Sequence, residues 1–213
     1  MQGLIGRKLG MTQVFDEAGR RVAVTVIEAG PCVVVQRKTQ ACDGYDAVQL
    51  GFGETKERRV TKAAMGRFRK AGTTARRVVR EFFADDGDEQ KEGDTVSLDI
   101  FEGVERVDVT GVTKGRGFAG VVRRHGMHGG PKTHGGHSKR RVGAIGQCAY
   151  PARVAKGRGM PGHMGHVRTT QQNLKIVARR PEDNVILIHG AVPGPSGSVV
   201  LVKKALKRAG KAE

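Results

Sequence analysis

The sequence predicts a mainly β protein with minor α, built as a small antiparallel β-barrel body with a long, basic, Gly-rich extended loop. Two observations predict this fold class. Short β-branched runs separated by turn residues occupy both ends of the chain, as in strands joined by tight connections. Between them, residues 109–181 hold 15 Lys and Arg but no Asp or Glu, and glycines recur throughout. A chain of 213 residues is long enough to bury a core without metal or disulfide cross-links.

The first strands are expected in the N-terminal third of the chain. A hairpin turn is predicted at DEAG, residues 16–19, and Gly30-Pro31 separates the second strand from the third. A further turn is expected at Asp43-Gly44. These breaks delimit four candidate strands in a small barrel or sandwich, at residues 11–15, 21–28, 32–38 and 47–52.

A short helix is predicted at residues 61–71, inside a helix-containing insertion near residues 55–80. Thr61 can cap its N-terminus, Ala, Lys and Arg favour helix inside it, and Gly72 can end it. Its basic side chains could contact a nucleic acid or form a solvated face, and both interpretations stay open for Lys62, Arg67, Arg69 and Lys70.

Strands are expected to resume after this helix and again near the C-terminus. Residues 78–83 and 95–101 flank an acidic turn at 84–94, and residues 185–190 and 198–204 are separated by the loop AVPGPSG. The predicted barrel body therefore comprises residues 1–108 together with 182–213. Residues 109–181 form the predicted basic extended loop.

The charge of the chain is concentrated in one segment. Residues 1–108 hold 18 basic and 18 acidic side chains, and residues 182–213 hold 5 and 3, so most of the net charge of +17 lies in residues 109–181. Ordinary solvated surfaces mix both signs. The segment also lacks the apolar residues needed to offset its ordering entropy, so alone it is expected to be extended or disordered. A polyanion, first of all a nucleic acid, is the predicted partner.

Cysteine usage and hydropathy bear on the compartment. The three cysteines form no C-x-x-C pair, which favours neither a disulfide framework nor a thiolate zinc site. No apolar run approaches the ~20 residues that cross a bilayer, and no secretory signal is expected at the N-terminus. We expect a cytoplasmic protein without a membrane partner.

Two motifs raise the alternative of an enzyme. GRGFAG at residues 115–120 fits G-x-G-x-x-G, but no acidic residue follows within about 20 positions to hold a ribose. Histidine pairs such as His125 and His128 could bind zinc on a helix, but neighbouring glycines oppose a helix and no carboxylate is nearby. We therefore expect no catalytic residues, metal, cofactor or small-molecule substrate. A nucleotide- or metal-dependent enzyme and a DNA-coating protein are the alternatives.

Folded RNA is the expected form of nucleic acid. Aromatic residues are too scarce for a single-strand stacking platform, whereas glycines let a cationic backbone approach phosphates closely. The candidate RNA-binding residues are the polar and basic side chains of the loop, namely Lys114, Arg116, Arg123, Arg124, His125, Lys132, His134, His137, Lys139, Arg140, Arg141, Gln147, Arg153, Lys156, Arg158, His163 and Arg168.

Several ordered stretches resemble the family of the third protein of the large ribosomal subunit, in its bacterial form. They are GLIGRKLGMTQVF, VTVIEAGPCVVVQ, DGYDAVQLGFG, VDVTGVTKGRGFAGVVRRHG, THGGHSKRRVGAIGQCAYPARVAKGRGMPGHMG and GAVPGPSGS. The resemblance implies a structural constituent that binds large-subunit ribosomal RNA beside neighbouring ribosomal proteins. It further implies a loop that reaches toward the peptidyl transferase centre, with its tip near residues 145–153, and a role in early subunit assembly. Ala149 aligns with a glutamine that is methylated in some relatives.

Overall fold

A computed structural model describes residues 1–85 and 90–207. The chain divides into two compact units, one comprising Met1–Val112 and the chain from Arg168 onward, the other Thr113–Val167. Residues 86–89 of the predicted acidic turn and residues 208–213 of the predicted body lie outside the described residues. We refer to the two parts as the barrel unit and the basic unit.

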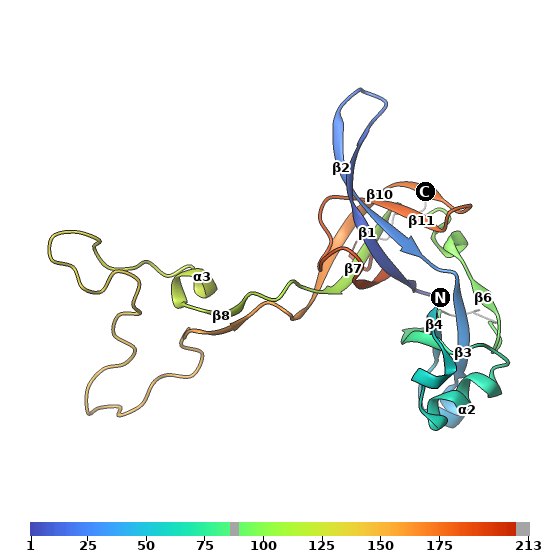
Figure 1. Ribbon diagram of the computed structural model, residues 1–213, viewed down its shortest axis with the longest axis horizontal. Helices are drawn as coiled ribbons and strands as arrows, with labels where there is room; N and C mark the ends of the chain where they lie inside the picture. Colours follow the sequence, from blue (N-terminus) through green and yellow to red (C-terminus); the bar gives the residue numbers. More distant parts are fainter. Residues whose placement is uncertain (86–89, 208–213) are drawn as a thin grey trace. The chain divides into compact units, whose positions relative to one another are not determined.

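The barrel unit contains a closed antiparallel barrel of six strands (Figure 1). Around the barrel the strands follow the order β1 (Gly3–Phe15), β12 (Val199–Lys204), β7 (Arg106–Val112), β10 (Arg168–Arg180), β11 (Val185–His189) and β2 (Arg21–Ala29). Strands from both ends of the chain thus close one sheet, which confirms the predicted barrel.

The N-terminal strand closes the barrel against the C-terminal strand. Gly3 lies opposite Lys203, and a Cβ atom at Gly3 would come within 2.2 Å of the carbonyl oxygen of Val202. Because real Cβ contacts are never this short, only glycine permits this approach of the two backbones. Beyond its pairing with β12, β1 continues as a hairpin with β2, visible in Figure 1 as the blue ribbon that passes the other barrel strands.

A second, four-stranded sheet stands beside the barrel strands in the same unit. Its order is β5 (Arg76–Phe83), β4 (Ala47–Glu54), β3 (Cys32–Lys38) and β6 (Thr95–Val96). Three of the strands predicted for the barrel body, at residues 32–38, 47–52 and 78–83, therefore belong to this sheet. The strand predicted at residues 95–101 ends after Val96, and its remainder forms a 3₁₀ helix, η2 (Leu98–Phe101).

The helices are few and short. The predicted helix is confirmed as α2 (Lys62–Lys70), where the Thr61 side chain accepts a hydrogen bond from the amide of Ala64. Phe68 packs this helix onto the sheet against Val35 and Ala75. The others are α1 (Gln40–Asp43), α3 (Val121–His125) and the 3₁₀ helix η1 (Glu57–Arg59).

One hydrophobic core runs through both sheets of the barrel unit. It joins barrel residues such as Ile5 and Ile186 to Leu50 and Phe82 of the second sheet. The 3₁₀ helix η2 contributes Phe101, which is fully buried in this core. The two sheets are therefore held together by shared apolar side chains.

Lys8 is a buried cation that fastens a loop to the barrel. Its ammonium donates hydrogen bonds to the carbonyl oxygens of Val192, at 2.9 Å, and Gly194, at 3.0 Å. The amide of Gly197 in turn donates to the carbonyl oxygen of Lys8. These bonds fix the Gly- and Pro-rich loop between β11 and β12 against β1.

We expect the cysteines to differ sharply in reactivity. Cys32 is buried and donates to the carbonyl oxygen of Ile5, and burial raises the pKa of its thiol to about 12. Cys42 and Cys148 are exposed. Because the thiolate is the nucleophile, a chromogenic disulfide reagent at pH 8 should titrate two thiols quickly and the third only after denaturation. Rapid reaction of all three thiols in the folded chain would contradict the burial of Cys32.

Candidate nucleic-acid interface

The basic unit starts from a small hairpin. Strand β8 (Gly117–Ala119) pairs with β9 (Gly162–Met164), and the five-residue helix α3 follows β8 directly. Val121 of α3 and Ala119 are its buried apolar residues. The hairpin and α3, with this small core, are the part of the 55-residue unit that has regular secondary structure.

The two chain segments that begin and end the basic unit are tied together by backbone bonds. The amide of Thr113 donates to the carbonyl oxygen of Val167 at 2.9 Å, and the amide of Arg116 donates to that of Met164 at 2.8 Å. Gly165 lies between these bonds with φ at 75°, and a Cβ there would meet the carbonyl oxygen of Lys114 at 2.2 Å. A glycine is required at this position.

Residues 126–161 contain neither helix nor strand. Their internal order comes from backbone packing, as at Gly129, where a Cβ would lie 2.0 Å from the carbonyl oxygen of Lys139. An isolated bridge joins Cys148 to Pro151, and the Arg158 guanidinium donates to the carbonyl oxygen of Ala144 at 2.8 Å. The structure thus gives this stretch few internal bonds and almost no apolar core.

Every residue predicted to bind RNA is exposed. All but Arg168 lie in the basic unit, and Arg168 is the first residue of β10. The basic unit holds 11 Lys and Arg and no acidic residue. The segment therefore presents an uninterrupted set of cationic side chains to solvent.

Besides Arg158, which bonds to Ala144, two of these side chains also stabilise the basic unit itself. Arg124 donates to the carbonyl oxygen of Met160 at 2.7 Å, and a ring nitrogen of His125 lies 3.0 Å from the same oxygen. Arg124 and His125 hold the end of α3 against the returning chain, so their replacement would disturb structure as well as charge.

Two aromatic residues were absent from the predicted site. Phe118 is 79% exposed and Tyr150 is 88% exposed. An exposed aromatic ring in a cationic segment can stack on an unpaired base. Both are aromatic residues in a segment with too few apolar residues to form a core, and this sequence signal could have identified them as exposed.

The predicted loop limits differ from the structural ones. Residues 109–112 complete β7 and residues 168–180 form β10, so both ends of the acid-free segment lie in the barrel. A count of charges marks where cations are, but it does not report which backbone groups pair in a sheet. The predicted division at 109–181 stays a prediction about RNA contact.

The geometry around the two enzyme motifs departs from what each chemistry needs. Of the three glycines in residues 115–120, Gly117 begins the three-residue strand β8 and Gly120 precedes α3, which has five residues, so they do not form a turn between a long strand and a long helix. His125 ends α3, so His128 does not share a helix face with it. In residues 1–85 and 90–207, no group of three or more His, Cys, Asp or Glu could hold a metal ion.

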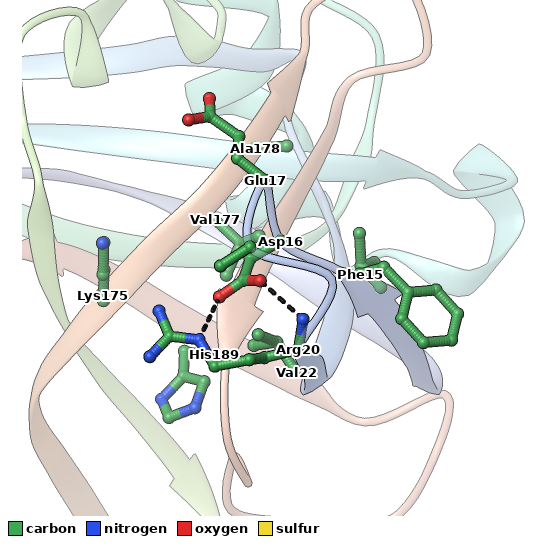
Figure 2. Close-up of a pocket in the computed structure, with 11 residues that line it drawn as sticks. Phe15, Asp16, Glu17, Arg20, Val22, Lys175, Val177, Ala178 and His189 are labelled. Carbon is green, nitrogen blue, oxygen red and sulfur yellow. Dashed lines mark hydrogen bonds and ion pairs between the residues drawn. The ribbon is translucent and has the colours of Figure 1, made fainter.

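A cleft of about 710 Å³ lies beside the tip of the β1–β2 hairpin (Figure 2). Asp16 accepts hydrogen bonds from the amide of Arg20, at 2.8 Å, and from its Nε, at 3.0 Å, as Figure 2 shows. Lys175 and His189 come from the neighbouring strands β10 and β11. The Asp16 carboxylate is thus used to close the hairpin turn.

Among the helices that the structure describes, none has the length and apolar character to cross a membrane.

The basic unit lies in the sequence between the barrel strands β7 and β10, and its exposed cations have no acidic residue among them. This arrangement is typical of a structural protein that neutralises a polyanion. The family model for ribosomal protein L3 matches residues 35–180. The chain is 50% identical over 211 residues to large ribosomal subunit protein uL3 of Brachyspira pilosicoli, covering 99% of this chain and 97% of that protein. It is 53% identical over 208 residues to the uL3 protein of Corynebacterium jeikeium, covering 97% and 95%. The chain belongs to the ribosomal protein L3 family, whose members are structural ribosomal proteins and not enzymes.

Proposed function

We propose that this chain, as a structural constituent of the large ribosomal subunit, binds ribosomal RNA through the cationic side chains of residues 109–181. The observation that carries the proposal is the acid-free charge of this segment together with the exposure of every candidate side chain. Phosphate neutralisation by Lys and Arg supplies most of the affinity of such contacts. Since residues 126–161 have almost no core of their own, RNA supplies the contacts that order them.

The tip of the segment, near residues 145–153, is proposed to reach toward the peptidyl transferase centre. Tyr150 and Ile145 are exposed there, and Arg153 adds a cation. An apolar and cationic surface of this kind suits the close packing of RNA bases and phosphates. Neighbouring large-subunit proteins are proposed to contact the barrel unit.

Directed cleavage from a tethered iron probe tests the reach of the tip. With Cys42→Ser, the exposed thiol of the described residues is Cys148, because Cys32 is buried. Subunits carrying the probe at Cys148 should be cleaved at nucleotides of the peptidyl transferase centre. The matched control is Cys148→Ser with the probe on Cys42 of α1, which should cleave a separate set of nucleotides. Cleavage from Cys148 outside that centre would contradict the proposed reach.

The proposed role in early assembly predicts an effect of the order of addition. If RNA orders the basic unit early in assembly, the bound basic unit also stabilises the fold of that RNA. The chain should therefore promote subunit reconstitution when it is added first. Addition after the other proteins should give a lower yield of active subunits. Equal yields in either order would remove the assembly role and leave RNA binding intact.

In RNA-free protein we expect proteases to cut residues 126–161 first. Trypsin has many sites in this stretch, its backbone lies in no helix or strand, and local opening there costs little free energy. The barrel unit should persist as resistant fragments, identified by mass spectrometry. Added ribosomal RNA should protect the same sites. Resistance of residues 126–161 in the absence of RNA would contradict this account of their ordering.

A further inference from the structure

The charge balance of residues 1–108 conceals a second basic region. Residues 55–80 contain 10 Lys and Arg and one acidic residue, Glu57, whereas residues 81–108 contain 2 basic and 11 acidic residues. Because residues 1–108 hold equal numbers of basic and acidic side chains, their net charge of zero hides this basic region. Residues 55–80 thus have a higher net charge per residue than the basic unit, and they carry it on a folded sheet and helix.

The structure gathers part of this charge around one cleft. Helix α2, the 3₁₀ helix η1 and strand β5 border a cleft of about 470 Å³, and no acidic residue is among the residues that line it in the described structure. Five arginines from these separate elements line the cleft, namely Arg59, Arg67, Arg76, Arg77 and Arg80. Basic residues in the last turn of α2 can stabilise its dipole, but this reason does not extend to the arginines of η1 and β5.

The cleft is held by packing and not by the arginines. Phe68 of α2 is buried against Val35 and Ala75, and Val60, Met65 and Val79 pack around them. Arg76 has a structural role, because it lies across Gly51 and forms an ion pair with Glu54 at 3.5 Å. Arg80 donates a hydrogen bond to the carbonyl oxygen of its neighbour Val79. The four lining arginines other than Arg76 are exposed.

Besides Glu54, which pairs with Arg76, two acidic side chains in and just after β5 have partners that do not line the cleft. Glu81 of β5 lies 3.0 Å from the ammonium of Lys38 and accepts a hydrogen bond from Gln49. Asp85 lies 3.1 Å from the N-terminal amino group of Met1. Like charges that converge without carboxylates repel each other, and a bound polyanion removes that repulsion.

We propose that this cleft is a second phosphate-binding site for large-subunit ribosomal RNA, on the folded part of the barrel unit. The inference rests on the proposed RNA-binding function and extends it to residues outside 109–181. Guanidinium groups match phosphate oxygens with two parallel N–H donors. Since no aromatic side chain other than buried Phe68 lines the cleft, it binds backbone phosphates and does not stack on bases.

Glutamine replacements at the four exposed arginines test this site in the full chain. The variant carries Arg59→Gln, Arg67→Gln, Arg77→Gln and Arg80→Gln, with Arg76 left unchanged. Binding to a large-subunit ribosomal RNA transcript is measured by filter retention over a range of salt concentrations. Each lost phosphate contact lowers the log–log slope by roughly 0.7–0.9, so the slope should fall by about 3. Hydroxyl-radical footprinting of the same complexes should show a patch of lost protection.

Two control variants separate charge from structure. Lysine at the same four positions keeps the charge and should retain most of the salt slope. Arg21→Gln removes an exposed arginine from β2, leaves the Arg20–Asp16 pair in place and should leave the slope and footprint unchanged. Thermal melting of all variants should match that of the parent chain, because these side chains are outside the core.

The outcomes also separate this inference from the proposed function. If glutamine variants in the basic unit lose slope while the cleft variant does not, only the second site is wrong. If neither set loses slope, both proposals fail. If the cleft variant binds RNA normally but is lost from assembled subunits, its partner is an acidic protein surface, and the phosphate site is overturned.

Discussion

Replacing Arg116, Arg123, Arg140 and Arg141 with glutamine should lower the affinity for large-subunit ribosomal RNA roughly 10²- to 10³-fold at 0.15 M salt. All four side chains are exposed in the acid-free basic unit. Each contributes a phosphate contact whose energy comes from counterion release, so the loss is largest at low salt and vanishes toward 1 M. Filter binding against salt concentration measures both the affinity and a slope lowered by about 3.

The choice of these four arginines avoids a structural artefact. Arg124 is left unchanged because its guanidinium holds the carbonyl oxygen of Met160. The matched control replaces the same four residues with lysine, which keeps the charge and should retain most of the salt slope. An unchanged slope in the glutamine variant would show that the cations of this unit do not carry the RNA contact.

Phe101→Ala should destabilise the RNA-free chain by about 3–5 kcal/mol. Phe101 is fully buried where η2 joins the core shared by the barrel and the second sheet. Removing its ring leaves a cavity that surrounding side chains fill only in part. Since domains are stable by roughly 5–15 kcal/mol, urea unfolding followed by circular dichroism should shift to a much lower midpoint.

Phe118→Ala supplies the same chemical change at an exposed position. Phe118 is 79% exposed in β8 of the basic unit, and its loss should change the free energy of unfolding by less than about 0.5 kcal/mol. A loss below about 1.5 kcal/mol for Phe101→Ala would be too small for a core phenylalanine. It would indicate that η2 is not packed as described.

The strands that the sequence analysis predicted are those whose β-branched residues form short, well-bounded runs. Residues 185–190 and 198–204 became β11 and β12 nearly unchanged. Strand β10 was missed because RTTQQNLKIVARR is polar and mostly exposed, and because its cations assigned it to the loop. It is a strand through its backbone pairing with β7 and β11, which composition does not reveal.

The separation of the second sheet was equally hidden. Strands β3 and β4 have the same apolar character as the barrel strands, and the choice of neighbour depends on the shared core around Leu50 and Phe82. The first half of β1, with Gly3, Gly6 and Lys8, has too many glycines and charges to be predicted as a strand. These residues can form a barrel strand because the glycines allow the neighbouring backbones to approach closely, and because backbone carbonyls of the β11–β12 loop accept hydrogen bonds from Lys8.

The exposure of the candidate side chains agrees with the charge count, whereas their contact with RNA stays a prediction. Counting charge located the exposed cations, since sixteen of the seventeen candidates lie in the basic unit. The count did not show that Arg124 and His125 serve the fold of that unit. The zero net charge of residues 1–108 also hid how basic residues 55–80 are, because the 11 acidic residues of 81–108 offset them; of the five arginines around the cleft, the sequence analysis named Arg67 alone as a possible nucleic-acid contact.

The pairing of β1 with β12 has a consequence for biosynthesis. Residues 3–7 cannot pair with residues 199–203 until the ribosome has translated that later strand. At roughly 5–20 residues per second, about 10–40 s pass between the two strands. The cationic segment is made during this delay, so a nascent chain exposes it to cellular polyanions before the barrel that should carry it has closed.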